Sequence, residues 1–125
     1  DIIIWDREID AKGNLLMPGF KNAHTHTPMT FLRSFADDLP LQEWLQQKVF
    51  PNEARLKGED TYWLAILGIM EYLTSGITSN FDMYIMQDYH INAYVDTGFR
   101  TVFTSGFYRQ SGSAGGELFK NQRAE

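Results

Sequence analysis

Hydrophobic and polar positions form short blocks along the chain, and turn residues separate these blocks. The first block, residues 2–5, is β-branched and aromatic, and the second, residues 15–17, ends at a Pro-Gly pair. Both patterns are typical of short strands. Residues 20–26 should be extended as well, because the segment is too short between its breakers for a stable helix and Pro28 disfavours helical backbone at the preceding residue. The pattern therefore predicts three extended segments before the first helix.

Helical spacing begins at Pro28, which suits a first helical position and predicts one or two turns there. Apolar residues recur at near-helical spacing over residues 41–50, and we expect Pro51 to end that helix. The clearest helix spans residues 58–75, because its first turn is acidic and Gly76 follows it. Its apolar stripe consists of Trp63, Ile66, Leu67, Met70 and Leu73.

The remainder of the chain alternates between strand and helix patterns. We expect strands at residues 77–83 and 99–107, and helices at residues 87–97 and from Gly116 onward. Short connections lead from each helix into the next strand. This alternation indicates an α/β fold with parallel βα units, and it argues against a sandwich or a helix bundle.

Composition and charge describe an ordinary folded domain. Of the 125 residues, 43% are hydrophobic and 14% are aromatic, which excludes a disordered tail. Eleven Lys and Arg against sixteen Asp and Glu give a formal charge of -5, and no stretch gathers the basic residues into a stripe. We therefore expect no binding to the phosphate backbone of a nucleic acid.

The absence of Cys excludes a disulfide framework, a thiolate metal site and a cysteine nucleophile. The longest nearly uncharged stretch, residues 61–69, is about half as long as a membrane-spanning helix, and no signal peptide opens the chain. We therefore expect a cytoplasmic protein with no membrane partner. Because the chain begins at Asp1 without Met and stops at Glu125 in a predicted helix, we also expect it to be part of a longer protein.

His24 and His26 are the residues that most directly suggest a chemical function. On a strand, residues two apart point to the same side, so both imidazoles could face one cation, whereas on a helix they would diverge. A bare H-x-H pattern is weak evidence, and the alternative is a pair of half-buried histidines satisfied by their neighbours. The position at the end of the first strand of a βα series favours the metal site. A catalytic zinc site uses about three protein ligands, so the two histidines are an incomplete set.

Four segments give the chain a resemblance to a known family. Residues 16–29, LMPGFKNAHTHTPM, resemble the opening of the metal-dependent amidohydrolase superfamily, whose first barrel strand carries a PGx-x-N-x-H-x-H segment. Residues 32–45, LRSFADDLPLQEWL, together with PNEARL at 51–56 and FDMY at 81–84, resemble a narrower branch. That branch contains the 5-methylthioadenosine/S-adenosylhomocysteine deaminases and related triazine chlorohydrolases. The resemblance extends from residue 15 to about residue 116.

The resemblance implies a TIM-type (β/α)8 barrel, which takes about 250 residues when complete. Residues 18–125 would form about the first three βα units of this barrel. Residues 1–17 would hold two strands of a small β-sandwich whose other strands come from elsewhere in the parent chain. We expect this N-terminal segment to lack support, and we expect an open sheet edge and exposed apolar helix faces.

The resemblance also implies the reaction, a hydrolytic deamination of adenine nucleosides of the 5-methylthioadenosine/S-adenosylhomocysteine type. His24 and His26 match two ligands of one divalent metal, usually zinc, whose bound hydroxide attacks the amine-bearing ring carbon and releases ammonia. Glu53 matches an acid that accepts hydrogen bonds from ribose hydroxyls, a role that suits an ionised carboxylate. From the residues alone, Glu53 would instead be a solvated loop residue.

Two positions depart from the deaminase branch. Ser105 and Glu117 stand where these deaminases commonly carry arginines that hold the tail of the substrate. Arg109, in the same predicted loop, is our candidate to replace them. The departures leave the exact substrate open.

The family completes its site with later histidines, a Glu proton shuttle and an Asp, none of which matches a residue of this chain. We therefore assign no catalytic acid or base here and expect the chain alone to be inactive. His90, on a helix face, is expected to be structural or solvated, and Asp82 is expected to be a structural hydrogen-bonding residue at a strand end. The alternatives are hydrolysis of another heterocycle, as in guanine or cytosine deaminases and triazine chlorohydrolases, or a non-catalytic binding module. Whether the full-length protein forms a homo-oligomer stays open.

Overall fold

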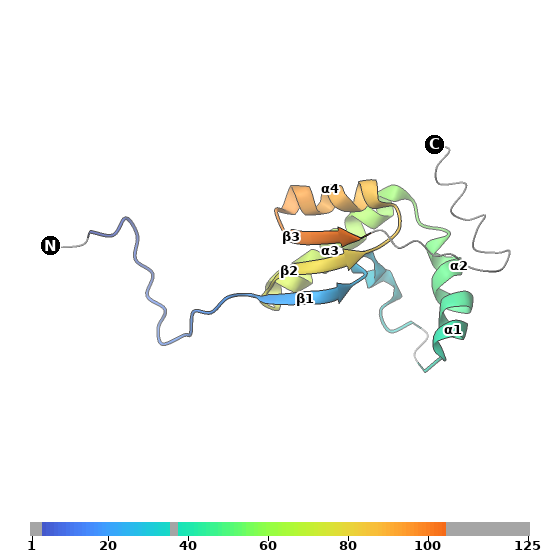
Figure 1. The fold of residues 1–125 in the computed structure, drawn as a ribbon, viewed down its shortest axis with the longest axis horizontal. Helices are drawn as coiled ribbons and strands as arrows, with labels where there is room; N and C mark the ends of the chain where they lie inside the picture. Colours follow the sequence, from blue (N-terminus) through green and yellow to red (C-terminus); the bar gives the residue numbers. More distant parts are fainter. Residues whose placement is uncertain (1–3, 36–37, 105–125) are drawn as a thin grey trace.

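The computed structural model describes residues 4–35 and 38–104 of the chain. Its three strands are parallel and lie side by side in the order β1-β2-β3 (Figure 1), so the prediction of parallel βα units is confirmed. The strands are β1 (Phe20–Thr25), β2 (Ile77–Met83) and β3 (Arg100–Thr104). Because spatial order follows chain order, the intervening helices carry each crossover between neighbouring strands.

The described part of the chain contains six helical segments besides the sheet, and two of them match predicted helices closely in their bounds. They are η1 (Thr27–Leu32), α1 (Leu41–Trp44), η2 (Leu45–Val49), α2 (Phe50–Glu53), α3 (Gly58–Thr74) and α4 (Gln87–Thr97). The helices predicted at residues 58–75 and 87–97 correspond to α3 and α4. The predicted strand at 99–107 is observed as β3 as far as Thr104, and residues 105–107 and the helix expected from Gly116 lie outside the described residues. Within residues 4–35 and 38–104, no helix is long and apolar enough to cross a bilayer.

Pro51 does not end the second helix, so that prediction was wrong. The helical backbone runs without a break from α1 through η2 into α2, which ends at Glu53. Two features accommodate the proline. It falls in the first turn of α2, where a missing N–H is tolerated, and η2 is a π-helical turn that widens the spiral just before it. The continued helix changes where Glu53 lies, because it is now a helix terminus and not a loop residue.

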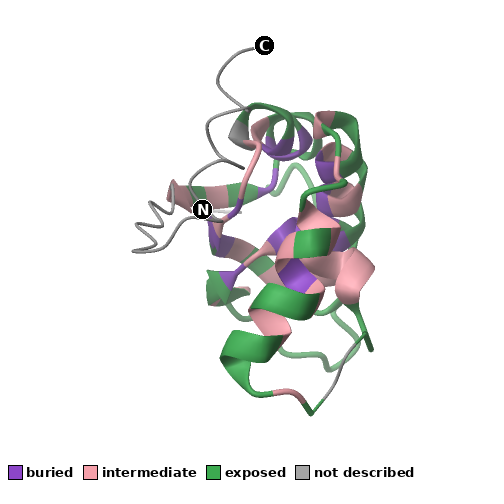
Figure 2. Cartoon of the chain, turned by 90° about the vertical axis from the view of Figure 1, so that its right-hand side faces the viewer, coloured by how far each residue is buried: buried purple, intermediate pink, exposed green. Residues whose placement is uncertain are grey.

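The core lies where α3 and α4 pack against one face of the sheet, and Figure 2 shows buried positions gathered there. Its buried members are Ala65, Ile69, Ala93, Tyr94 and Phe99. Helix α3 also approaches the segment after β1 closely. A Cβ atom added at Gly68 would lie 2.6 Å from Cγ2 and 3.1 Å from the backbone oxygen of Thr27. The glycine is therefore required by the contact between α3 and η1.

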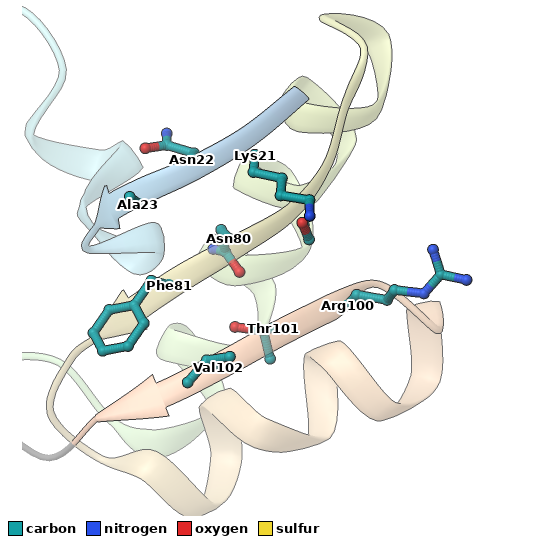
Figure 3. A pocket seen from close by; sticks show the side chains of 9 residues that line it. Lys21, Asn22, Ala23, Asn80, Phe81, Arg100, Thr101 and Val102 are labelled. Atoms are coloured by element: carbon teal, nitrogen blue, oxygen red, sulfur yellow. The ribbon is translucent and has the colours of Figure 1, made fainter. Parts of the chain in front are cut away.

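The opposite face of the sheet is open within the described part of the chain. Figure 3 shows a pocket at the sheet, lined by three consecutive residues of each strand, with Phe81 and Val102 among them. Phe81 on β2 is 45% exposed and Val102 on β3 is 57% exposed, although both are strand residues with large apolar side chains. One face of this sheet is thus covered by helices, and the other presents apolar groups to solvent.

The apolar stripe of α3 divides between two sides of the helix. Ile66 packs against the core, whereas Trp63, Leu67 and Met70 are exposed on the side away from the sheet. Two fully buried positions of the helix, Thr61 and Ala65, carry small side chains. The expectation of an exposed apolar helix face is confirmed.

The N-terminal segment forms no strand between residues 4 and 19, so the predicted strand at 15–17 is not observed. The predicted strand at residues 2–5 is described only from Ile4 onward, and that part is also not a strand. Figure 1 shows the segment running away from the sheet, and Leu16 is 94% exposed. A strand needs backbone partners on a neighbouring segment, and no described segment supplies them here.

Replacing Gly68 with Ala should destabilise the chain by about 1–3 kcal/mol, because the new methyl group would overlap Thr27. The free energy of unfolding, measured in urea, tests this. Replacing the exposed Met70 with Ala serves as a control on the same helix and should change stability by about 0.5 kcal/mol or less. Equal or higher stability of the Gly68→Ala protein would contradict the close contact.

Candidate metal centre and its surroundings

The two histidines of the H-x-H segment lie together at the carboxyl end of β1. His24 is exposed near the end of the strand, and His26 is the residue immediately before η1. Their ring centroids are 5.1 Å apart, with the rings nearly perpendicular. β1 supplies extended backbone as far as Thr25, and His26 follows it directly with φ -130° and ψ 70°, so the strand predicted to reach residue 26 ends one residue earlier. The two imidazoles are still close enough to approach one cation together.

A bulge in β1 adjusts this end of the strand. Asn22 pairs with Asn80 and Thr25 pairs with Asp82, so β1 advances by three residues over a stretch in which β2 advances by two. A bulge re-aims side chains and is common beside functional sites. Nothing in the hydrophobic pattern indicates it.

His26 is oriented by a backbone group of the neighbouring strand. Its Nδ1 atom lies 2.7 Å from the carbonyl oxygen of Met83 at the end of β2. A carbonyl only accepts, so Nδ1 must carry the hydrogen, and Nε2 of the neutral ring keeps a free lone pair. Metal-binding histidines commonly donate their other ring nitrogen in this way. The tautomer of His26 thus suits a cation bound at Nε2.

The described residues contribute only these two imidazoles to a cation. Across residues 4–35 and 38–104, no group of three or more His, Asp or Glu side chains comes together in a metal-binding arrangement. Two neutral imidazoles fit a divalent ion such as zinc as part of a ligand set, and the remaining ligands of a catalytic site would have to come from elsewhere.

Glu53 lies at the same end of the sheet, at the last residue of α2. Burial raises the pKa of its carboxyl group, and the nearby Tyr84 hydroxyl and His26 ring counteract part of this rise. Because His26 affects the pKa of Glu53, the predicted substrate-binding residue lies near one of the two predicted metal ligands. The sequence placed both in one site only through the family resemblance.

Tyr84, which sequence reasoning did not select, completes this group. It follows β2 directly, is buried, and stacks edge-on against His90. Its hydroxyl faces Glu53 closely enough for each to affect the other's pKa, although no hydrogen bond of standard geometry joins Tyr84 to any described residue. The hydroxyl is a buried polar group without a direct partner in the described chain.

Asp82 is fully buried at the end of β2, and its predicted role as a structural hydrogen-bonding residue is confirmed. Oδ1 accepts hydrogen bonds from the Thr25 hydroxyl at 2.9 Å and the Thr27 backbone N–H at 3.0 Å. Oδ2 accepts one from the Tyr94 hydroxyl at 2.6 Å and lies 2.9 Å from Nε2 of His90. His90, which was expected to be structural or solvated, is fully buried beside Asp82 and is therefore not solvated.

The carboxylate of Asp82 stays ionised despite its burial. Desolvation alone would raise its pKa, but the contacts with His90, Thr27 and Tyr94 outweigh desolvation and lower the pKa to about 2. The network is reinforced by Asn80, whose side-chain amide donates to the hydroxyls of Thr25 and Tyr94. The result is a polar cluster directly beneath the H-x-H segment.

The positions that were expected to settle the substrate, Ser105, Arg109 and Glu117, lie outside the described residues. The hypothesis that Arg109 replaces the family arginines stays a prediction.

Comparison with known proteins places the chain in a class. A model of the amidohydrolase family matches residues 15–117, and the chain belongs to that family. This agrees with the parallel βα units and with the H-x-H segment at the end of the first of them.

Among curated relatives, the chain is similar to proteins named 5-methylthioadenosine/S-adenosylhomocysteine deaminase. It is 41% identical to the one from Symbiobacterium thermophilum, over 90% of this chain and 30% of the relative. Identity is 48% with that of Syntrophomonas wolfei, over 82% and 24% of the two chains, and 52% with that of Acetivibrio thermocellus, over 76% and 22%. The chain thus spans between a fifth and a third of the length of these relatives.

The low pKa of Asp82 predicts a pH-dependent stability. Its folded pKa of about 2 lies below the ordinary value of 3.8 for an aspartate, so the stabilisation is complete above about pH 4 and is lost as the pH falls through 2. The amount is about 2 kcal/mol. Urea unfolding between pH 5 and 2 should show this loss in the parent protein and not in the Asp82→Asn variant. Replacing the exposed Asp88 with Asn is the control and should preserve it; parallel pH curves for parent and Asp82→Asn would contradict the assignment.

Proposed function

We propose that the chain contributes two metal ligands and a substrate-binding carboxylate to a metal-dependent deaminase of adenine nucleosides, of the 5-methylthioadenosine/S-adenosylhomocysteine type. The observation that carries this is the pair His24 and His26 at the carboxyl end of a parallel strand, with Nδ1 of His26 held by the Met83 carbonyl. The relatives that share 41–52% of the aligned residues are named for that activity. The compartment that we propose is the cytoplasm.

We infer that the three strands belong to a closed (β/α)8 barrel. In such a barrel the sheet folds on itself, so the inner face becomes a packed interior and the helices form the outer layer. The open face that carries Phe81 and Val102 suits that interior, and the carboxyl ends of the strands form the rim where barrel enzymes place their sites. Residues 18–125 would form the first three βα units. Residues 1–17 would join a small β-sandwich, which accounts for the exposed apolar side chains between residues 4 and 17.

Each group of the chain has a distinct part in this proposal. His24 and His26 would hold one divalent cation, and we propose zinc because neutral imidazole is a good ligand for it. When bound, the cation supplies Lewis acidity that activates water for hydrolysis near neutral pH. Met83 keeps Nε2 of His26 free for binding, and the chain offers no described residue for proton transfer to the leaving ammonia.

Glu53 would fix the sugar of the substrate. In its ionised form the carboxylate only accepts hydrogen bonds, which matches a ribose that offers two neighbouring hydroxyl donors. Its closeness to His26 and Tyr84 favours a ligand that reaches from the metal to α2. This favours a ribose-bearing substrate over a free heterocyclic base.

Removing either imidazole should abolish the metal-dependent reaction. In the full-length protein, His24→Ala and His26→Ala should each lower the rate of ammonia release from 5-methylthioadenosine by at least about 100-fold. This loss exceeds the one that is typical when a residue that only hydrogen-bonds to a metal ligand is removed. Treatment with a chelator should inactivate the parent protein, and added zinc should restore it.

A substrate panel completes this test. Ammonia release from 5-methylthioadenosine and S-adenosylhomocysteine is compared with release from guanine and cytosine, and chloride release from a chlorotriazine is measured beside them. Preference for guanine, cytosine or the triazine would replace the proposed substrate class. Activity of the parent protein that survives complete removal of metal would contradict the proposal itself.

Replacing Glu53 with Gln should weaken substrate binding with little effect on turnover. The amide cannot offer two strong acceptors, so we expect the KM for ribonucleosides to rise about 10-fold or more while kcat stays similar. Steady-state kinetics on 5-methylthioadenosine and on its 2',3'-dideoxy analogue test this, because the analogue should not distinguish the two proteins. Glu59→Gln, at the exposed start of α3, is the matched control and should leave KM unchanged. An equal effect on both substrates would mean that Glu53 does not act on the sugar.

A further inference from the structure

The Asp82 carboxylate connects helix α4, which packs in the core, with the end of β1, which carries the two histidines. Its Oδ2 atom faces α4, where it meets the Tyr94 hydroxyl and Nε2 of His90. Its Oδ1 atom faces the end of β1, where it accepts from the Thr25 hydroxyl and the Thr27 backbone N–H. The side chain thus connects the buried face of α4 with the segment that holds the two histidines.

The residues bound by Oδ1 flank the imidazoles along the chain. Thr25 lies between His24 and His26, and Thr27 comes directly after His26. One carboxylate oxygen therefore restrains the backbone on both sides of His26 and just after His24. The next residue of β2, Met83, orients the His26 ring through its carbonyl oxygen. Two successive residues of β2 control both the backbone and the ring.

We propose that Asp82 is a positioning residue for the metal ligands, which presets the backbone of residues 24–27 so that both imidazoles are aimed before a cation arrives. This inference rests on the proposed function, because it takes His24 and His26 as ligands. Asp82 itself does not touch the metal. It acts through Thr25, Thr27 and the backbone between them.

The anchor of this arrangement is rigid. Tyr94 belongs to the buried core, and its ring packs edge-on against Phe103 with centroids 4.9 Å apart. His90 packs against Phe103 as well, at 5.3 Å. Both partners of Oδ2 are thus held in place by α4 and by packing against β3. Asp82 therefore fixes the end of β1 relative to this core. Ligands preset in this way lose less conformational freedom when a cation binds.

A purely structural role would be served as well by apolar side chains. Burying a carboxylate is costly, and replacing a buried ionic network by well-packed apolar groups is often neutral or stabilising. What apolar groups cannot supply is directional bonding to one hydroxyl and one N–H on either side of a ligand. The use of a charged residue that accepts three hydrogen bonds at this place is therefore explained by orientation.

The test uses the full-length protein with the variants Asp82→Asn and Thr25→Val. The Asn side chain places an NH2 group, which donates, where one carboxylate oxygen of Asp82 accepts a hydrogen bond. Val keeps the shape of Thr25 without its hydroxyl. Zinc affinity is measured by competition with a chelator, and the tautomer of His26 in the metal-free protein is measured from its ring 15N shifts. We expect the zinc dissociation constant to rise at least about 10-fold in both variants, and we expect the share of the Nδ1–H tautomer to fall in Asp82→Asn.

Two controls separate positioning from general stability. Thr25→Ser keeps the hydroxyl and should bind zinc as the parent does. Ile69→Ala removes apolar core packing but no hydrogen bond to Asp82, so it should lower stability without changing the zinc dissociation constant or the tautomer. Zinc affinity within twofold of the parent in both Asp82→Asn and Thr25→Val would overturn the inference. An equal loss of affinity in Ile69→Ala would also overturn it. A parent protein that binds no zinc would instead refute the proposed function, so the two failures are distinguishable.

Discussion

The buried carboxylate of Asp82 is the interaction on which the arrangement of the site depends. It lies at the end of β2 with no exposed surface, where three hydrogen-bond donors from β1, its continuation and α4 converge on it and Nε2 of His90 lies 2.9 Å away. A charge in such a position is tolerated only when it is fully paired. Asp82 therefore keeps the end of β1, the start of η1 and helix α4 in fixed relative positions. The H-x-H segment is part of this arrangement, because Thr25 and Thr27 flank His26 and both bind Asp82.

The layers of the fold explain why the site is at this edge. Parallel strands bring their carboxyl ends to one side of the sheet, and the helices that connect them pack on one face. His26 and Met83 meet because β1 and β2 are neighbours, and Glu53 reaches the same edge because the helical segment after η1 continues through Pro51. The same sheet leaves Phe81 and Val102 uncovered on its other face. The site and the apolar open face are thus two results of one parallel arrangement.

Much of the local structure was accessible from the amino-acid sequence. The period of β2 and α4, the glycines that follow α3 and α4, and the proline after the H-x-H segment were sufficient to locate the elements of the α/β unit. The structural role of Asp82 was also anticipated, although its partners were not. Pro51 was misjudged because its effect depends on a π-helical turn that no spacing rule indicates. The strand at 15–17 was misjudged because strand propensity forms a strand only when another segment pairs with it.

The sequence by itself determined the chemical repertoire: two imidazoles two residues apart, one candidate carboxylate at Glu53, no thiol and no basic stripe. It also determined the order of strands and helices, because that order is written in local periodicity and turn residues. Only the tertiary structure decided which nitrogen of His26 is free, which residue holds the ligand backbone, and that Tyr84 stands beside Glu53. The reason is physical. These properties arise from contacts between residues about 30 to 60 positions apart, and such contacts exist only once β1, β2 and α4 have packed together.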